Sequence, residues 1–272
     1  MEGFEAVSGA ATLVGEEIGD GPSVVLLHAG VADRRIWRSV AERLADRYRV
    51  IAYDRRGFGE TRYEAETFSH VDDLLAVLDA RGVDRAVLVG NSQGGRVATD
   101  TALEHPERVA ALLLIAPAIG GAPWPQEIPG RTLELEAAVD AADEAGDIEE
   151  ANRLEAWLWL DGPDAAQGRI GGAARELFLD MNGIALRAAD VGDERTVESA
   201  WDRIEQIAVP VLFLTGDLDV PVLLDFADEL ARRMPHAAAE VITGAAHLPM
   251  LENPELVARL IRTFVDRGAP AG

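Results

Sequence analysis

Short apolar runs that alternate with amphipathic helical segments are the feature that most constrains the fold of this chain. The apolar runs lie at residues 23–28, 50–53, 86–90, 110–116, 209–215 and 240–243. The helical patterns lie between and after them, at residues 36–46, 71–81, 93–103, 222–233 and 254–266. Buried strands that alternate with helices predict an α/β fold with a mostly parallel sheet and helices on both faces. Residues 3–18 leave little room for a helix and are expected to form an antiparallel hairpin.

One long region breaks this alternation. Residues 120–205 contain helical patterns and several prolines but no strand-like run. A helical insertion between two strands of a parallel sheet is expected to lie as a cap over the sheet edge. We therefore expect an α/β core formed by residues 1–119 and 206–272, with a helical cap formed by residues 120–205. A separate helical domain is less favoured, because these helices are few and acidic.

The charge of the chain excludes several classes of function. The 272 residues include 25 basic and 48 acidic side chains, for a net charge of −23, and all of the basic residues are arginine. Without lysine, neither a Schiff base nor a P-loop phosphate site can form. Such an acidic surface repels phosphates, so we expect no nucleic-acid partner.

Other features that the sequence lacks limit the ligands and the cellular location that we expect. The chain has no cysteine, which excludes disulfides and thiolate zinc sites. No spacing of histidines and carboxylates suggests a metal site, and no nucleotide motif is present, so we expect no metal and no cofactor. No apolar run is long enough to span a membrane, and residues 1–14 lack the basic residues of a secretory signal. A cytoplasmic protein without membrane contact is therefore expected, either a monomer or a homodimer.

The sequence VLVGNSQGG places a serine at a tight turn from a strand to a helix. Ser92 has Gly90 two residues before it and Gly94 two residues after it, which is the pattern G-x-S-x-G. In such a turn the serine adopts a strained backbone that exposes its hydroxyl at the carboxyl end of the strand, where parallel sheets bind ligands. Larger side chains in place of the glycines would clash. The pattern predicts a nucleophilic serine.

A nucleophilic serine needs a base and an acid that orients the base. Among the five histidines, His247 follows the last strand-like run and comes after the candidate acids, in the chain order Ser–Asp–His. Asp217 and Asp219 both follow the strand-like run 209–215. We favour Asp219, and Asp217 remains the alternative.

Several linked segments resemble the α/β-hydrolase superfamily, and specifically its small, capped, cofactor-free serine hydrolases. GNSQGG is similar to the nucleophile elbow, and DRRGFGET, residues 54–61, is similar to the turn D-x-R-G-x-G-x-[ST]. TGDLD and AAHLPMLENPE resemble the acid and histidine loops. LLHAG resembles the His-Gly segment of the oxyanion hole, although Ala29 stands where glycine is usual. The resemblance extends over nearly the whole chain.

The resemblance implies an eight-stranded, mostly parallel sheet with a cap inserted before the last strands. It implies a catalytic triad of Ser92, His247 and Asp219, and an oxyanion hole formed by the backbone N–H groups of Gly30 and Gln93. It also implies hydrolysis of a small-molecule ester through an acyl-enzyme. A serine nucleophile excludes the relatives that use aspartate, namely haloalkane dehalogenases and epoxide hydrolases.

The substrate is less constrained by the sequence. Trp37, Trp124, Trp157 and Trp159 are candidate substrate-binding residues, and an aromatic pocket with few charges suits a neutral ester. Hydrolases of carbon–carbon bonds and of enol-lactones use the same triad, and arginines of residues 120–205 could bind their carboxylates. The carbon–carbon hydrolases usually carry tryptophan after the histidine, where this chain has Leu248. A non-enzymatic ligand sensor is the alternative from another class.

Overall fold

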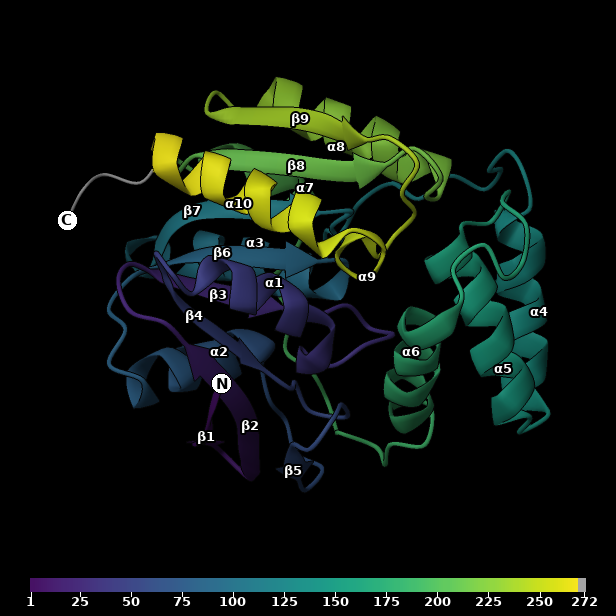
Figure 1. Cartoon of the computed structure of the whole chain (residues 1–272), viewed down its shortest axis with the longest axis horizontal. Coiled ribbons are helices and arrows are strands. Elements are labelled where there is room, and N and C mark those ends of the chain that lie inside the picture. The colour runs from purple at the N-terminus through teal and green to yellow at the C-terminus, as the bar shows by residue number, and fades with distance from the viewer. Residues whose placement is uncertain (269–272) are drawn as a thin grey trace.

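A single mixed sheet runs through the centre of the protein, as Figure 1 shows for the computed structural model, in which residues 1–268 are described. Within these residues the sheet has nine strands. Their bounds are β1 Glu2–Ser8, β2 Ala11–Ile18, β3 Ser23–Leu27, β4 Arg49–Tyr53, β5 Arg62–Tyr63, β6 Ala86–Asn91, β7 Val109–Ile115, β8 Val211–Gly216 and β9 Ala237–Ile242.

The strand order is β1-β2-β4-β3-β6-β7-β8-β9. Strands β1 and β2 form the expected antiparallel hairpin, β2 also pairs antiparallel with β4, and all later neighbours are parallel. The predicted mostly parallel sheet of eight strands is therefore confirmed along this path. Strand β5, which was not expected, adds a two-residue pairing to the edge of β2.

Helices cover both faces of the sheet (Figure 1). Their bounds are α1 Arg38–Leu44, α2 His70–Ala80, α3 Gln93–Glu104, α4 Thr132–Glu144, α5 Ile148–Glu155, α6 Gly172–Ala185, α7 Ala200–Arg203, α8 Pro221–Arg233, α9 Pro249–Glu252 and α10 Pro254–Gly268. Within residues 1–268, none of these helices combines the length and the apolar character needed to cross a membrane. Successive residues of β3 enter different cores: Val24 packs in the cluster that includes α1 and α10 residues, and Val25 packs in the cluster that includes α2, α3 and α8 residues.

Strand β9 differs from its predicted position. The apolar pattern predicts a strand at residues 240–243, but the strand begins at Ala237 and ends at Ile242. Three consecutive alanines have little intrinsic preference for a strand. They adopt one here because they pair in parallel register with β8, from Val211 opposite Ala237 onward.

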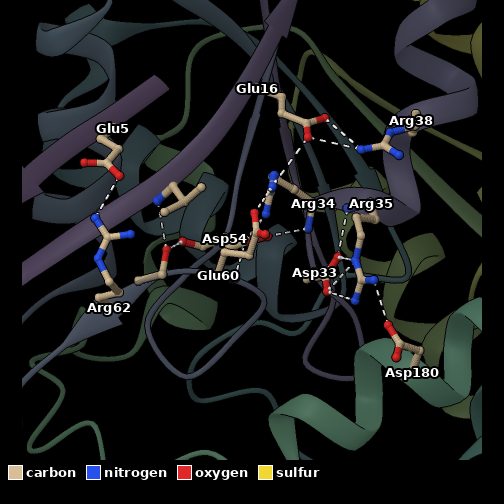
Figure 2. Close-up of polar contacts among 12 residues, drawn as sticks. Glu5, Glu16, Asp33, Arg34, Arg35, Arg38, Asp54, Glu60, Arg62 and Asp180 are labelled. Atoms are coloured by element: carbon tan, nitrogen blue, oxygen red, sulfur yellow. Dashed lines mark hydrogen bonds and ion pairs between the residues drawn. The ribbon is translucent and has the colours of Figure 1, made fainter. Parts of the chain in front are cut away.

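Helices α4, α5 and α6 of residues 120–205 lie beyond the carboxyl ends of β8 and β9, whereas α7 lies beside the sheet (Figure 1). Helices α4 and α5 are followed by a π-helical turn, Ala156–Asp161, and then by α6. Among the ion pairs that connect this helical insertion to the rest of the chain, two lie at α6 and at the segment before it. Arg35 Nη1 lies 2.7 Å from Asp180 Oδ2 on α6 (Figure 2), and Arg169 Nη1 lies 2.6 Å from Glu252 Oε2 on α9.

The loops after β3 and β4 are joined around the buried carboxylate of Asp54 (Figure 2). Its oxygens accept the backbone N–H groups of Arg34 and Glu60, each at 2.8 Å, and the Arg34 guanidinium forms an ion pair with it. Burial raises the pKa of Asp54 to about 6, while the N–H of Glu60 and the charge of Arg34 oppose the rise. This network explains the requirement for aspartate at the start of the DRRGFGET segment.

Helix α3 buries another carboxylate, that of Asp100, with far fewer contacts that stabilise its ionised form. The side chain is 5% exposed, and its Oδ1 atom has no hydrogen-bond partner. Burial raises the pKa of Asp100 to about 7, and the Arg96 charge opposes this rise only in part. In the folded protein Asp100 therefore retains a proton at pH values where the unfolded chain has lost it.

The replacement Asp100→Asn should stabilise the protein, and increasingly so as the pH rises. The folded pKa lies above the unfolded value of 3.8, so the stability of the wild type relative to the variant falls between pH 3.8 and about 7 and stays low above that range. Denaturant unfolding of both proteins from pH 4 to pH 8 measures the difference. If this difference is the same at every pH, the raised pKa of Asp100 is wrong.

Candidate active site

Ser92 lies at the turn between β6 and α3 in a strained backbone conformation. Its φ of 54° and ψ of −118° fall in a region that L-residues other than glycine rarely adopt. The neighbouring strand end holds this conformation, because the Ser92 N–H donates to the Ile115 carbonyl and the Ser92 carbonyl accepts the Ala118 N–H, both at 3.0 Å. The Ser92 hydroxyl does not cap α3.

The glycines around Ser92 are required by close backbone contacts. A Cβ atom on Gly90 would lie 2.4 Å from the carbonyl oxygen of Gly94. A Cβ atom on Gly94 would lie 2.3 Å from the carbonyl oxygen of Leu27 in β3. Helix α3 can therefore approach the sheet closely enough to begin directly after Ser92, with the positive end of its dipole beside the hydroxyl-bearing residue.

The structure brings His247 and Asp219 together. The two side chains are buried, and His247 Nδ1 lies 2.8 Å from Asp219 Oδ2. The other carboxylate oxygen of Asp219 accepts the N–H of Val220 at 2.7 Å, which fixes the plane of the group. Asp217, the alternative acid, is exposed and accepts the N–H of Gly244 at 2.6 Å. Asp219 is therefore the carboxylate in contact with the histidine.

Asn91, which precedes Ser92, joins the serine turn to the histidine loop. Its Nδ2 atom donates to the His247 carbonyl at 3.1 Å and to the Ile115 carbonyl at 3.0 Å. The side chain is fully buried. Sequence reasoning missed this role, because the residue between Gly90 and Ser92 is unspecified in G-x-S-x-G. A polar residue at the last position of a buried strand was the available indication.

Gly30 and Gln93 lie next to each other beside Ser92. Gly30 follows β3, and a Cβ atom placed on it would lie 2.5 Å from Gln93 Nε2. The alanine at position 29 is compatible with this loop, because Ala29 does not have a positive φ and so does not need to be glycine. The backbone N–H groups of Gly30 and Gln93 remain the predicted oxyanion donors.

The four candidate tryptophans occupy different environments. Trp37 is fully buried in the core, and Trp124 is 45% exposed and packs edge-on against Phe226, so neither adjoins His247 in the contacts described. Trp157 donates its Nε1–H to the Ala165 carbonyl at 3.0 Å within the helical insertion. Trp159 lies against His247, with ring centroids 4.6 Å apart.

Trp157 and Trp159 lie two residues apart in the π-helical turn Ala156–Asp161, so they point to different sides of it. π-helices are rare and occur often at functional sites. The turn ends at Asp161, a buried carboxylate that accepts the N–H groups of Gly168 at 2.8 Å and Ile170 at 2.9 Å and pairs with Arg175. These contacts fix the segment that presents Trp159 to His247.

A cavity of about 480 Å³ opens beside Gln93, between the loop after β4 and residues 185–194. Arg96 and Glu194 line it and form an ion pair at 2.7 Å. Three arginines of the helical insertion that are candidate carboxylate ligands are already paired: Arg153 with Glu150, Arg169 with Glu252 and Arg175 with Asp161.

Comparisons with known proteins identify the family of this chain. Residues 24–260 match the alpha/beta hydrolase family. The chain belongs to that family. It is 28% identical over 267 residues to the pimeloyl-[acyl-carrier protein] methyl ester esterase of Aeromonas hydrophila, covering 92% of this chain and 98% of the relative.

Two further similarities show the range of activities among relatives of this alpha/beta hydrolase. It is 28% identical to the 2-hydroxy-6-oxo-6-phenylhexa-2,4-dienoate hydrolase of Burkholderia cepacia, over 93% of this chain and 90% of the relative. The crystal structure of an esterase from Rhodococcus sp. ECU1013 matches with a TM-score of 0.78 and 27% identity, covering 98% of this chain and 99% of the other. The protein is a hydrolase by family.

Proposed function

We propose that this alpha/beta hydrolase is a serine hydrolase that cleaves a small carboxylic ester through Ser92, His247 and Asp219. The backbone conformation of Ser92 is the observation that carries the proposal, because a strained serine at the carboxyl end of a central strand has no evident packing role. The contact between His247 and Asp219 supports it, as do the esterases of Aeromonas and Rhodococcus to which the chain is similar.

In the proposed reaction His247 Nε2 takes the proton of the Ser92 hydroxyl as Oγ attacks the ester carbonyl carbon. Asp219 holds the imidazole through Nδ1 and stabilises its cation. The carbonyl oxygen becomes an oxyanion that accepts the N–H groups of Gly30 and Gln93, each donor contributing about 3 kcal/mol to lowering the barrier. The tetrahedral intermediate expels the alcohol, which receives the proton from His247. Water activated by the same histidine then releases the carboxylic acid and restores Ser92.

The dienoate hydrolase of Burkholderia supports a second candidate, the cleavage of a carbon–carbon bond or an enol-lactone by the same residues. Leu248 follows His247 here and is fully buried, whereas Trp159 supplies an aromatic ring to the histidine from the helical insertion. A panel of p-nitrophenyl esters, lactones and dienoates, tested with the wild type and Ser92→Ala, separates the candidates. Thermal stabilisation by a ligand without turnover would favour a sensor.

Ser92→Ala should abolish ester hydrolysis and labelling by a fluorophosphonate while the thermal unfolding remains cooperative. Ser199 provides the matched control, because it also has a positive φ, of 49°, but its hydroxyl donates to Asp202. Ser199→Ala should keep both the ester hydrolysis and the fluorophosphonate labelling. Intact-protein mass spectrometry measures the labelling, and a label on any serine other than Ser92 contradicts the proposal.

Asp219→Asn should lower kcat strongly, by analogy with the ~10⁴-fold loss that follows replacement of a triad aspartate. Asp217→Asn should have a much smaller effect, because Asp217 is exposed and contacts Gly244 rather than His247. Steady-state kinetics on p-nitrophenyl butyrate compare the two variants. A greater loss in Asp217→Asn would show that the acid is assigned wrongly.

Trp159→Ala should change the preference among esters of increasing acyl length, by roughly 1–3 kcal/mol in discrimination, because its ring adjoins His247. Trp157→Ala should reduce stability and leave the preference unchanged, because Trp157 packs within the helical insertion. Values of kcat/KM across the ester series test this difference. If Trp159→Ala keeps the wild-type profile, the side chain only packs the insertion against the sheet.

A further inference from the structure

Arg55 is a buried cation without a carboxylate partner. The residue follows β4 and is 1% exposed, and no ion pair within residues 1–268 includes it. The next residue, Arg56, is buried as deeply but pairs with Asp73 and Glu66. An uncompensated buried charge is costly, so the contacts that Arg55 makes instead need an explanation. Burial lowers the pKa of Arg55 to about 10, which leaves the guanidinium charged at neutral pH.

The guanidinium of Arg55 donates to the two segments that carry the predicted oxyanion donors. Its Nη2 atom lies 3.2 Å from the carbonyl oxygen of Ala29 and 3.4 Å from that of His28. Its Nη1 atom lies 3.1 Å from Oε1 of Gln93. One side chain therefore contacts both the loop before Gly30 and the side chain of Gln93.

His28 reinforces the contact at Ala29. The backbone N–H of Arg55 donates to His28 Nε2 at 3.1 Å, so Nδ1 carries the hydrogen and donates to the Ala29 carbonyl at 2.7 Å. Burial and the Arg55 charge keep the pKa of His28 well below its usual value, which maintains this neutral form. The Ala29 carbonyl thus accepts two hydrogen bonds, one of them from a cation.

The Ala29 carbonyl and the Gly30 N–H belong to the same peptide group. In a planar trans peptide they point in opposite directions. Two donors that hold the carbonyl on one side therefore fix the N–H toward the other side. They also polarise the amide, and such polarisation strengthens a linked hydrogen bond by ~10–30%.

We propose that Arg55 is a positioning residue of the oxyanion hole. It holds the Ala29–Gly30 peptide with its N–H toward the reacting carbonyl oxygen, fixes the side chain of Gln93 beside it, and places a permanent positive charge behind both donors. This inference rests on the proposed esterase function. The effect should be greatest when the oxygen bears a full negative charge, and so on kcat rather than on KM.

The test compares Arg55→Gln, Arg55→Lys and a control, Arg195→Gln. Arg195 is also cationic, but it is exposed and pairs with Asp72 instead of contacting the loop before Gly30. Kinetics on p-nitrophenyl butyrate give kcat and KM. The inhibition constant of an aliphatic trifluoromethyl ketone reports on the oxyanion separately, because addition of serine to the ketone forms one.

Arg55→Gln should lower kcat by roughly 10- to 100-fold, less than or comparable to the loss of a direct oxyanion donor, with a small change in KM. The inhibition constant of the ketone should rise by a similar factor. Arg55→Lys should recover part of the loss, because it keeps a charge but not the planar fork. Arg195→Gln should behave as the wild type.

A folded Arg55→Gln variant that keeps the wild-type kcat and inhibition constant overturns the inference, as does a loss of stability alone. If Arg55→Gln does not fold, Arg55→Lys must show a lower kcat together with a higher inhibition constant of the ketone. If neither variant folds, the role of Arg55 is purely structural and the inference is overturned. A wild type that neither hydrolyses the ester nor binds the ketone overturns the proposed function itself. Wild-type activity with unaffected Arg55 variants overturns only the inference about Arg55.

Discussion

The positive φ of Ser92 is the constraint on which the rest of the site depends. A non-glycine residue in this conformation costs about 1–3 kcal/mol, and it persists only where the surroundings determine it fully. Here the end of β7 binds both backbone groups of Ser92 through Ile115 and Ala118, and Gly90 and Gly94 allow α3 to pack directly on the sheet. The parallel register of β6 and β7 thus sets the position of one side chain at the sheet edge.

The same register gathers the remaining groups at that edge. Asp219 follows β8 and His247 follows β9, neighbouring parallel strands whose carboxyl ends lie together. Asn91 then connects β6 to the histidine loop across the sheet edge. On the other side of Ser92, the loops after β3 and β4 are joined through Asp54 and through Arg55. The site is therefore a set of strand ends linked by side chains buried between them.

The sequence predicts those features that depend on local pattern. Apolar periodicity and glycine spacing predict the strand–turn–helix at Ser92, the hairpin of β1 and β2 and the helical insertion. They do not predict the first half of β9, because its alanines become a strand only through pairing with β8. The sequence indicates that Asn91 is unusual, as a polar residue at the end of a buried strand, but the partners of Asn91 and Arg55 cannot be predicted, since they are carbonyl oxygens distant in the chain or in another loop. The divergence of Trp157 and Trp159 could be expected from a helix, whereas the contact with His247 could not.

The two ion pairs that connect helix α6 and the segment at Arg169 to the rest of the chain are not equivalent. Asp180 is 60% exposed and Arg35 is 28% exposed, whereas Glu252 is 7% exposed and its Arg169 partner also bonds to the backbone of Leu160 and Asp161. Dissolved salt screens exposed pairs far more than buried ones. Of these two contacts, the Arg35–Asp180 pair on α6 is therefore the more sensitive to salt, while the segment after α6 is also held by the Arg96–Glu194 and Arg195–Asp72 pairs. Arg169 binds the carbonyls of Leu160 and Asp161, directly after Trp159, so the ring beside His247 is anchored by the contact that salt weakens least.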